Sequence, residues 1–167
     1  QAGAATTTGK TNVFVGAGAG DANTTGELNT FIGGFAGSAA TTAASNTAVG
    51  AYAFDAGTGA TNTAVGAGAL GGASNSASNN VAVGKDAGNA VSTGTENVLV
   101  GTTAGGSIST GSNNTAVGYD ALGSATTVSG NTAIGSHALQ DTTGANNTGI
   151  GKDTLKENSS GADNVAI

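Results

Sequence analysis

The residues best suited to chemistry are a histidine and three aspartates that occupy one place in a repeating sequence. His137 is the only histidine, and Asp86, Asp120 and Asp153 stand at the same place in other repeats. Stacked repeats would bring His137 near Asp120 and Asp153, which would suit acid–base or metal chemistry. The sequence provides no recognisable nucleophile beside them. We therefore interpret this column as exposed polar surface and expect no enzyme activity, no catalytic residue, no cofactor and no metal.

The element that positions these residues is a short motif, Asn–Thr/Val–x–Val/Ile–Gly. Subtracting successive Asn numbers gives steps of 17, 17, 16, 18, 17, 17, 17, 16 and 17 residues. A period in this range signals a solenoid. The sequence predicts one repeat array over residues 12–167, with residues 1–11 as the end of a preceding coil. The predicted coils start at Asn12, Asn29, Asn46, Asn62, Asn80, Asn97, Asn114, Asn131, Asn147 and Asn164.

The composition agrees with a solenoid and excludes two other classes. With 4% aromatic residues, 31 Gly and no Trp, Met or Cys, the chain cannot build a conventional globular core. Disordered chains carry more charge than the 8% found here and fewer β-branched residues. The absence of Pro leaves every backbone N–H free for a ladder. We therefore predict an all-β parallel β-solenoid of about ten coils of ~17 residues.

Charge and hydropathy limit the partners. A net charge of −6 with only four Lys and Arg residues leaves no basic patch for nucleic acid. No apolar run approaches the ~20 residues of a membrane-spanning helix. The chain starts without Met and stops inside a repeat, so we expect it to be a piece of a longer protein. The lack of Cys is compatible with an extracellular location, since a repeat ladder needs no disulfides.

Each column of the repeat has its own expected role when the Asn is numbered position 1. Position 4 is always Val or Ile and position 2 is Thr or Val. Because alternate residues of a strand share a face, we expect both positions to point inward. Position 3, which includes Phe14, Phe31 and Leu99, would then point outward as an apolar stripe for contact with other chains.

The remaining columns predict how the coil closes. Position 5 is Gly in every complete copy, which indicates a corner where the strand ends. Position 8 is Ala in all but one copy, which predicts an inward site in a narrow interior. Position 9, either Leu or Phe or else Gly, is expected to cover the core at one rim, within a second extended segment near positions 7 to 10. The Asn either occupies a left-handed corner or forms a ladder between coils.

The motif Asn-[Thr/Val]-Ala-[Val/Ile]-Gly-x-x-Ala resembles the head repeat of trimeric autotransporter adhesins, most closely at Asn80–Ala87 and Asn131–Ala138. It is also similar to repeat arrays of bacteriophage tail fibres. The resemblance covers residues 12–167 but only about eight positions per repeat. It implies a left-handed β-roll with three chains side by side, the Val/Ile column inside each roll and the intervening Ala column toward its neighbours. A longer repeat and Ala in place of the family's second Ser favour a fibre variant over an adhesin head.

Three functions follow as hypotheses. The first is a rigid trimeric segment of an extracellular fibre, of the phage tail fibre type, that positions a receptor-binding tip. Receptor or glycan contacts would then lie outside this chain. The second is a bacterial surface adhesin that binds host matrix or carbohydrate by itself. The third is an ice-binding solenoid, because flat Thr-bearing faces can order water, although Thr at position 2 is expected to point inward. The expected location is a virion fibre or a bacterial cell surface.

Overall fold

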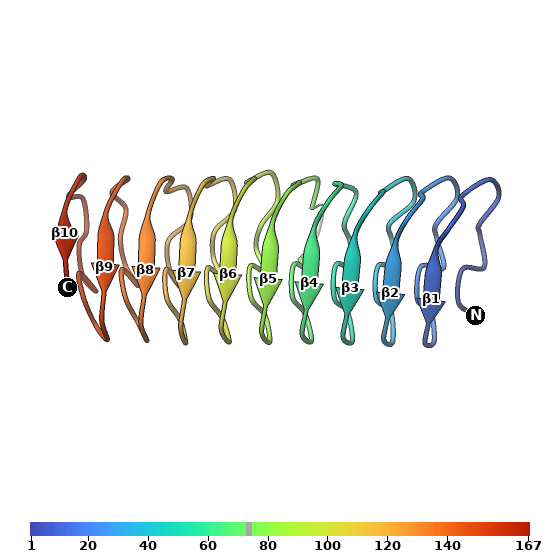
Figure 1. Cartoon of the computed structure of the whole chain (residues 1–167), viewed down its shortest axis with the longest axis horizontal. Helices are drawn as coiled ribbons and strands as arrows, with labels where there is room; N and C mark the ends of the chain where they lie inside the picture. Colours follow the sequence, from blue (N-terminus) through green and yellow to red (C-terminus); the bar gives the residue numbers. More distant parts are fainter. Residues whose placement is uncertain (73–74) are drawn as a thin grey trace.

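The computed structural model describes residues 1–72 and 75–167 and shows an all-β rod (Figure 1). One short strand per coil pairs with the strand of the next coil, giving a ten-stranded sheet in the order of the sequence. The predicted parallel β-solenoid is therefore confirmed. The strands are β1 (Val13–Val15), β2 (Thr30–Ile32), β3 (Thr47–Val49), β4 (Thr63–Val65), β5 (Val81–Val83), β6 (Val98–Val100), β7 (Thr115–Val117), β8 (Thr132–Ile134), β9 (Thr148–Ile150) and β10 (Val165–Ala166).

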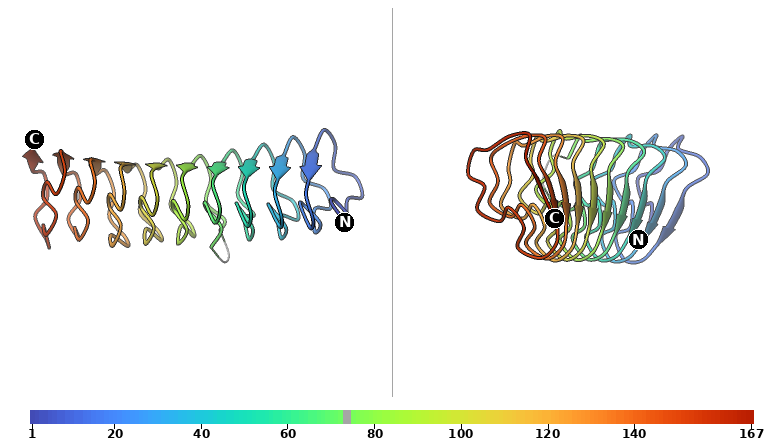
Figure 2. Two further views of the ribbon diagram at one scale, coloured as in Figure 1. Left: turned by 90° about the horizontal axis from the view of Figure 1, so that it is seen from below. Right: turned by 60° about the vertical axis from the view of Figure 1, so that its left-hand side comes forward.

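The strands lie along one side of the rod, and turns form the rest of each coil (Figure 2). All nine strand pairs are parallel and in the same register: Thr47 pairs with Thr63 across a 16-residue step, and Thr63 pairs with Val81 across an 18-residue step. Changes in repeat length are therefore absorbed outside the strands. Residues 1–11 lie against the first coil, where the Gly3 N–H donates to the Ala19 carbonyl at 2.9 Å.

The predicted orientation of the strands is wrong. Position 3 points into the coil, since Phe31, Ala48 and Leu99 are fully buried. Positions 2 and 4 point out: Val83 is 37% exposed, and Val49 and Val65 are only half-buried. The reason lies in the width of the interior. The residue at position 4 is Val or Ile in every coil, whatever the size of the other residues in that coil. Such a column would overfill a narrow core, whereas on the outer face the size of its side chains is not constrained.

The core is filled by pairs of complementary size at positions 3 and 9. Where position 3 is Phe or Leu, position 9 is Gly, as in Phe31 with Gly37; a Cβ added at Gly37 would lie 2.5 Å from the Phe31 ring. Where position 3 is Ala or Gly, position 9 is Phe or Leu, as in Ala48 with Phe54. The pairs are Phe14/Gly20, Phe31/Gly37, Ala48/Phe54, Ala64/Leu70, Leu99/Gly105, Ala116/Leu122, Ala133/Leu139 and Gly149/Leu155.

The fifth coil departs from this rule, and its neighbours compensate. Ala82 and Gly88 are both small, but a Cβ at Gly88 would lie 2.7 Å from Leu99 Cδ1 and 2.9 Å from Leu70 Cδ2. Leucines of the two adjacent coils therefore fill the space, and Val91 of the same coil is also buried against it. Packing density is conserved along the stack rather than within each coil.

Positions 7 to 10 form turns, so the prediction of a second extended segment is wrong. Positions 7 and 9 take left-handed backbone angles even when they are not Gly, for example φ 58° at Phe35 and φ 47° at Leu70. Two such residues so close together fold the chain back into the interior. Leu70 and Phe54 consequently lie in the core and not at its rim, whereas position 8 is buried Ala as predicted, as at Ala53 and Ala87.

The Asn column forms a buried ladder, which decides between the two interpretations of its role. Asn97 is fully buried; its Oδ1 accepts the backbone N–H of Asn114 at 3.0 Å, and its Nδ2 donates to the Gly111 carbonyl at 2.9 Å. The left-handed angle belongs to the preceding residue, as at Glu96 with φ 61°. Each Asn thus ties its own coil closed and bonds it to the next.

Two further features complete the coil. At the predicted corner, Gly84 has φ 134°, and a Cβ there would lie 2.5 Å from the Gly101 carbonyl oxygen of the next coil. On the far side from the strands, hydroxyls at position 13 donate to the next coil, as Ser92 Oγ does to the Ser109 carbonyl at 3.0 Å. The sequence analysis missed this second ladder, although a Ser or Thr recurs there in coil after coil.

Candidate functional site

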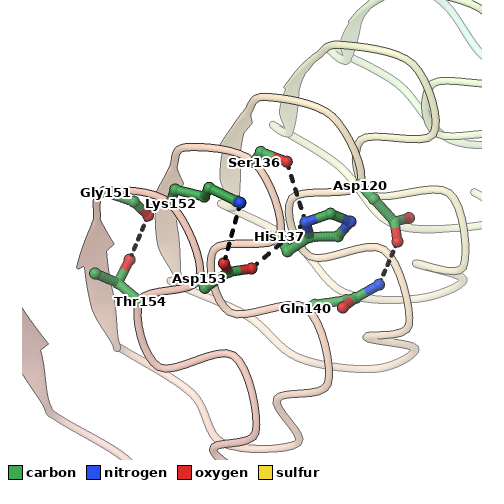
Figure 3. Close-up of polar contacts among 8 residues, drawn as sticks. All are labelled: Asp120, Ser136, His137, Gln140, Gly151, Lys152, Asp153 and Thr154. Atoms are coloured by element: carbon green, nitrogen blue, oxygen red, sulfur yellow. Dashed lines mark hydrogen bonds and ion pairs between the residues drawn. The ribbon is translucent and has the colours of Figure 1, made fainter.

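The column that contains His137 forms a polar cluster on the turns beside the strands (Figure 3). His137 Nδ1 lies 3.5 Å from Asp153 Oδ1 of the next coil and 3.1 Å from Ser136 Oγ. The Asp120 carboxylate accepts the side-chain amide of Gln140 instead. The predicted approach of His137 to Asp153 is therefore confirmed, while the hydrogen bond of Asp120 runs to a different partner.

This cluster holds a serine, a histidine and an aspartate without the geometry of a catalytic triad. In a triad, the two ring nitrogens serve different partners, so that the nucleophile meets one and the carboxylate orients the other. Here Ser136 and Asp153 both approach Nδ1 of His137. The histidine has no arrangement for passing a proton between them. Lys152 also lies 3.7 Å from Asp153, so the carboxylate is shared with an exposed cation.

The surroundings of the cluster are those of an open surface. The side chain of His137 is 27% exposed and that of Asp153 is 46% exposed. Tyr119 packs its ring edge-on against His137, with centroids 5.3 Å apart. Among residues 1–72 and 75–167, no three His, Asp or Glu side chains come together as metal ligands would, and no enclosed cavity is found.

The largest candidate surface is the outward side of the sheet, which we call the strand face and define as positions 2 and 4 of each coil. Its apolar members include Val15 at 54% exposure, Ile32 at 38% and Ile134 at 39%. None of the side chains at these two positions carries a charge in any coil. The charged residues lie on the turns, as with the pair Lys85 and Asp86, 3.1 Å apart. The sheet thus presents an uncharged strip along the whole rod.

A second uncharged surface is an aromatic pair that the sequence analysis missed. Phe35 and Tyr52 stand at position 7 of adjacent coils, with ring centroids 5.3 Å apart and planes inclined by 12°. Their exposed fractions are 44% and 54%. They are separate from the core rings of Phe31 and Phe54, which are buried, and Phe14, which is partly buried. The signal available in the sequence was two aromatic residues 17 positions apart at one place in the repeat.

The fold and its surfaces define a parallel β-solenoid protein whose coils are joined by an internal Asn ladder. No protein-family model, curated protein or solved structure matches this chain. In the part of the chain that the structure describes, no helix has the length and apolar character required to span a membrane.

Proposed function

We propose that this chain is a structural rod in an extracellular fibre, in which three copies pack side by side through their strand faces. The observation that supports this most directly is the continuous row of exposed or half-buried Val and Ile at position 4. At ~4.8 Å per coil, the row extends over roughly 45 Å. Exposed apolar strips of this length mark contact surfaces, because removing apolar surface from water is favourable.

A second copy is the partner that fits this strip best. Each row repeats with the strand spacing of the sheet, and only a surface with the same spacing can match it over many coils. Another copy of the rod has that spacing by construction, and closed symmetric association is the common rule for such chains. The strip also lacks the charges that would specify a polar partner, while Lys10, Glu27 and Glu96 stand on the turns that flank the strands.

The corrected orientation alters the basis of the trimer hypothesis. The contact stripe expected at position 3 lies in the core, and the Val and Ile expected inside each roll lie on the strand face. Threefold association now depends on positions 2 and 4. The narrow strip, two side chains wide in each coil, suits chains that meet around a common axis, with each chain touching two neighbours. The number three itself comes from the resemblance to trimeric fibres.

The test is the mass of the protein in solution. We expect three times the 15.4 kDa of one chain by light scattering or native mass spectrometry. The variant V83K/V100K places two charges in the middle of the strand face and should give folded monomers. The matched control T93K/T110K places the same charges on the opposite side and should leave the mass unchanged. A wild-type monomer at tens of micromolar would refute the proposal.

The ice-binding alternative gains from one observation. Thr at position 2 points outward, which removes the objection raised from the sequence: Thr47 and Thr63 pair in register, with Val49 and Val65 beside them. The Thr row is interrupted in four coils, which makes the face more apolar. The interrupting residues are Val13, Val81, Val98 and Val165. Thermal hysteresis measured on the wild type and on V83K/V100K separates the two functions. Activity that disappears in the variant, from a monomeric wild type, would favour ice binding.

A further inference from the structure

The position 7 column of the first five coils contains an arrangement that the proposed rod function does not use. Its residues are Gly18, Phe35, Tyr52, Gly68 and Asp86. Phe35, Tyr52 and Asp86 have left-handed backbone angles of φ 58°, 58° and 54°. Such angles disfavour side chains, and above all bulky ones. Two aromatic rings are thus held in a strained backbone at a place where they remain exposed and add little to the core.

Side chains in this column lean toward the preceding coil. A Cβ added at Gly18 would lie 2.7 Å from Phe35 Cδ1, so the Phe35 ring covers Gly18. Tyr52 stacks on Phe35 in the same sense. Asp86 leans onto Gly68, because Asp86 Oδ1 is the nearest atom to a Cβ added there. Gly68 itself has no side chain to place against Tyr52.

The missing side chain at Gly68 leaves the second face of Tyr52 without a neighbour in the column. The next side chain along the column belongs to Asp86, two coils beyond Tyr52. Measured along the rod, two strand spacings are about 9.6 Å. Lys85 lies 3.1 Å from one oxygen of this carboxylate. A carboxylate has several acceptor positions, so one cation does not exhaust them. The second face of the Tyr52 ring and the Asp86 carboxylate, which leans onto Gly68, therefore both border the place that a side chain at Gly68 would occupy.

We propose that a neutral sugar unit of a polysaccharide binds between the Tyr52 ring, which Phe35 supports, and the Asp86 carboxylate, at the place where Gly68 lacks a side chain. A sugar ring has an apolar C–H face, which packs on an aromatic ring, and a rim of hydroxyls, which donate to a carboxylate. The negative charge of Asp86 and the net charge of −6 disfavour anionic sugars and nucleic acid. A peptide strand would need an open sheet edge, and β3 and β4 beside this site are each paired on both sides.

The surface is shallow, since no enclosed cavity is found in the described part of the chain. A shallow site suits one unit of a long polymer better than a free monosaccharide, because few contacts are made per unit. The column runs along the rod, so a polymer lying lengthwise can also reach Ser38, which hydrogen-bonds to Asp55 three residues after Tyr52. Three parallel rods would multiply such weak contacts.

The test is native gel electrophoresis in the presence of dextran, a soluble mannan, a xyloglucan and a galactomannan, with alginate as an anionic comparison. We expect retardation of the wild type by at least one neutral polymer and not by alginate. The variant Y52G removes the ring, and Gly already stands at this position in the first and fourth coils. The variant G68F fills the gap with a residue that the second coil accepts there. Both should weaken binding by about tenfold, whereas Y119A should not.

The following results would refute the proposed sugar site. Wild-type protein that none of the neutral polymers retards, or equal retardation of Y52G and wild type, would refute it. A change in solution mass for Y52G, with no change in polymer binding, would assign the aromatic pair to contacts between chains. The site does not depend on the strand face, so a monomeric wild type that binds polymer would refute the trimer and leave this site intact.

Discussion

The side-chain oxygen of Asn114 accepts the backbone N–H of Asn131, 3.0 Å away in the next coil. The same bond joins every pair of successive Asn residues, from Asn12 and Asn29 to Asn147 and Asn164. Because the donors and acceptors are buried in the middle of the rod, water cannot replace a missing partner there. The motif that recurs in the sequence is therefore the internal fastening of each coil to the next.

Replacing Asn114 by Ala should destabilise the rod by about 3 kcal/mol, since it leaves the N–H of Asn131 and the carbonyl of Val128 buried without partners. Unfolding in guanidinium chloride measures the loss. The control is N113G at the exposed neighbouring residue, which has φ 58° and whose counterpart in the next coil is Gly130. N113G should be neutral. An N114A variant as stable as the wild type would mean that the ladder adds nothing.

The size rule at positions 3 and 9 predicts strong coupling between Phe31 and Gly37. F31A alone should cost about 3 kcal/mol by leaving a cavity, and G37L alone about 2 kcal/mol by overpacking against the Phe31 ring. The double variant F31A/G37L copies the pair Ala64 and Leu70 and should recover to within about 1 kcal/mol of wild type. A double-mutant cycle by chemical denaturation measures the coupling, and simple additivity of the two losses would contradict it.

The solenoid could be predicted from the sequence because its cause is periodic. Asn at position 1 and Gly at position 5 are set by contacts between one coil and the next, and these contacts recur in every coil. Any sequence that preserves them over the whole chain displays the period directly. In the structure the strand register follows the same positions, despite the 16-residue and 18-residue steps.

The orientation of the strand could not be decided from residue type alone. Val49 is β-branched and apolar, whereas Ala48 beside it is small, so hydrophobicity assigns Val49 to the core. The structure does the opposite: Phe54 of the same coil is fully buried in the core, and Val49 is half-buried on the strand face. The available signal was covariation. The size of the residue at position 3 changes with that at position 9, as expected of two residues in contact, whereas position 4 is Val or Ile whatever stands at position 9.

The candidate sites divide in the same manner. The sequence placed His137 and Asp153 together because both belong to one column, and the geometry at Nδ1 needed coordinates. The aromatic pair depended on the lean of position 7 side chains toward the preceding coil, which follows from left-handed backbone angles at Phe35 and Tyr52. Those angles cannot be read from a non-Gly residue, because most such residues avoid them.

Gly84 should tolerate no side chain, whereas Gly34 should accept one. A Cβ at Gly84 would lie 2.5 Å from the Gly101 carbonyl oxygen in a backbone with φ 134°, but one at Gly34 would meet no atom within 4 Å. We expect G84A to cost about 2 kcal/mol or more and G34A to be neutral or slightly stabilising. Thermal unfolding by circular dichroism compares the two. Equal melting temperatures would show that the corner between coils has room to relax.

Deleting one whole coil should shorten the rod without unfolding it. Removal of residues 114–130 joins Asn113 to Asn131, so Asn97 Oδ1 acquires the N–H of Asn131 in place of that of Asn114, and Leu99 meets Ala133 in place of Ala116. Each coil contacts only its neighbours, so the stability of the rod is a sum of terms for single coils and for interfaces between adjacent coils. The deletion should therefore lower the free energy of unfolding by the terms for one coil and one interface. Removal of residues 114–121 instead breaks the register and should abolish cooperative unfolding. If circular dichroism and chemical denaturation show both deletions to be equally folded, the coils are not the units of stability.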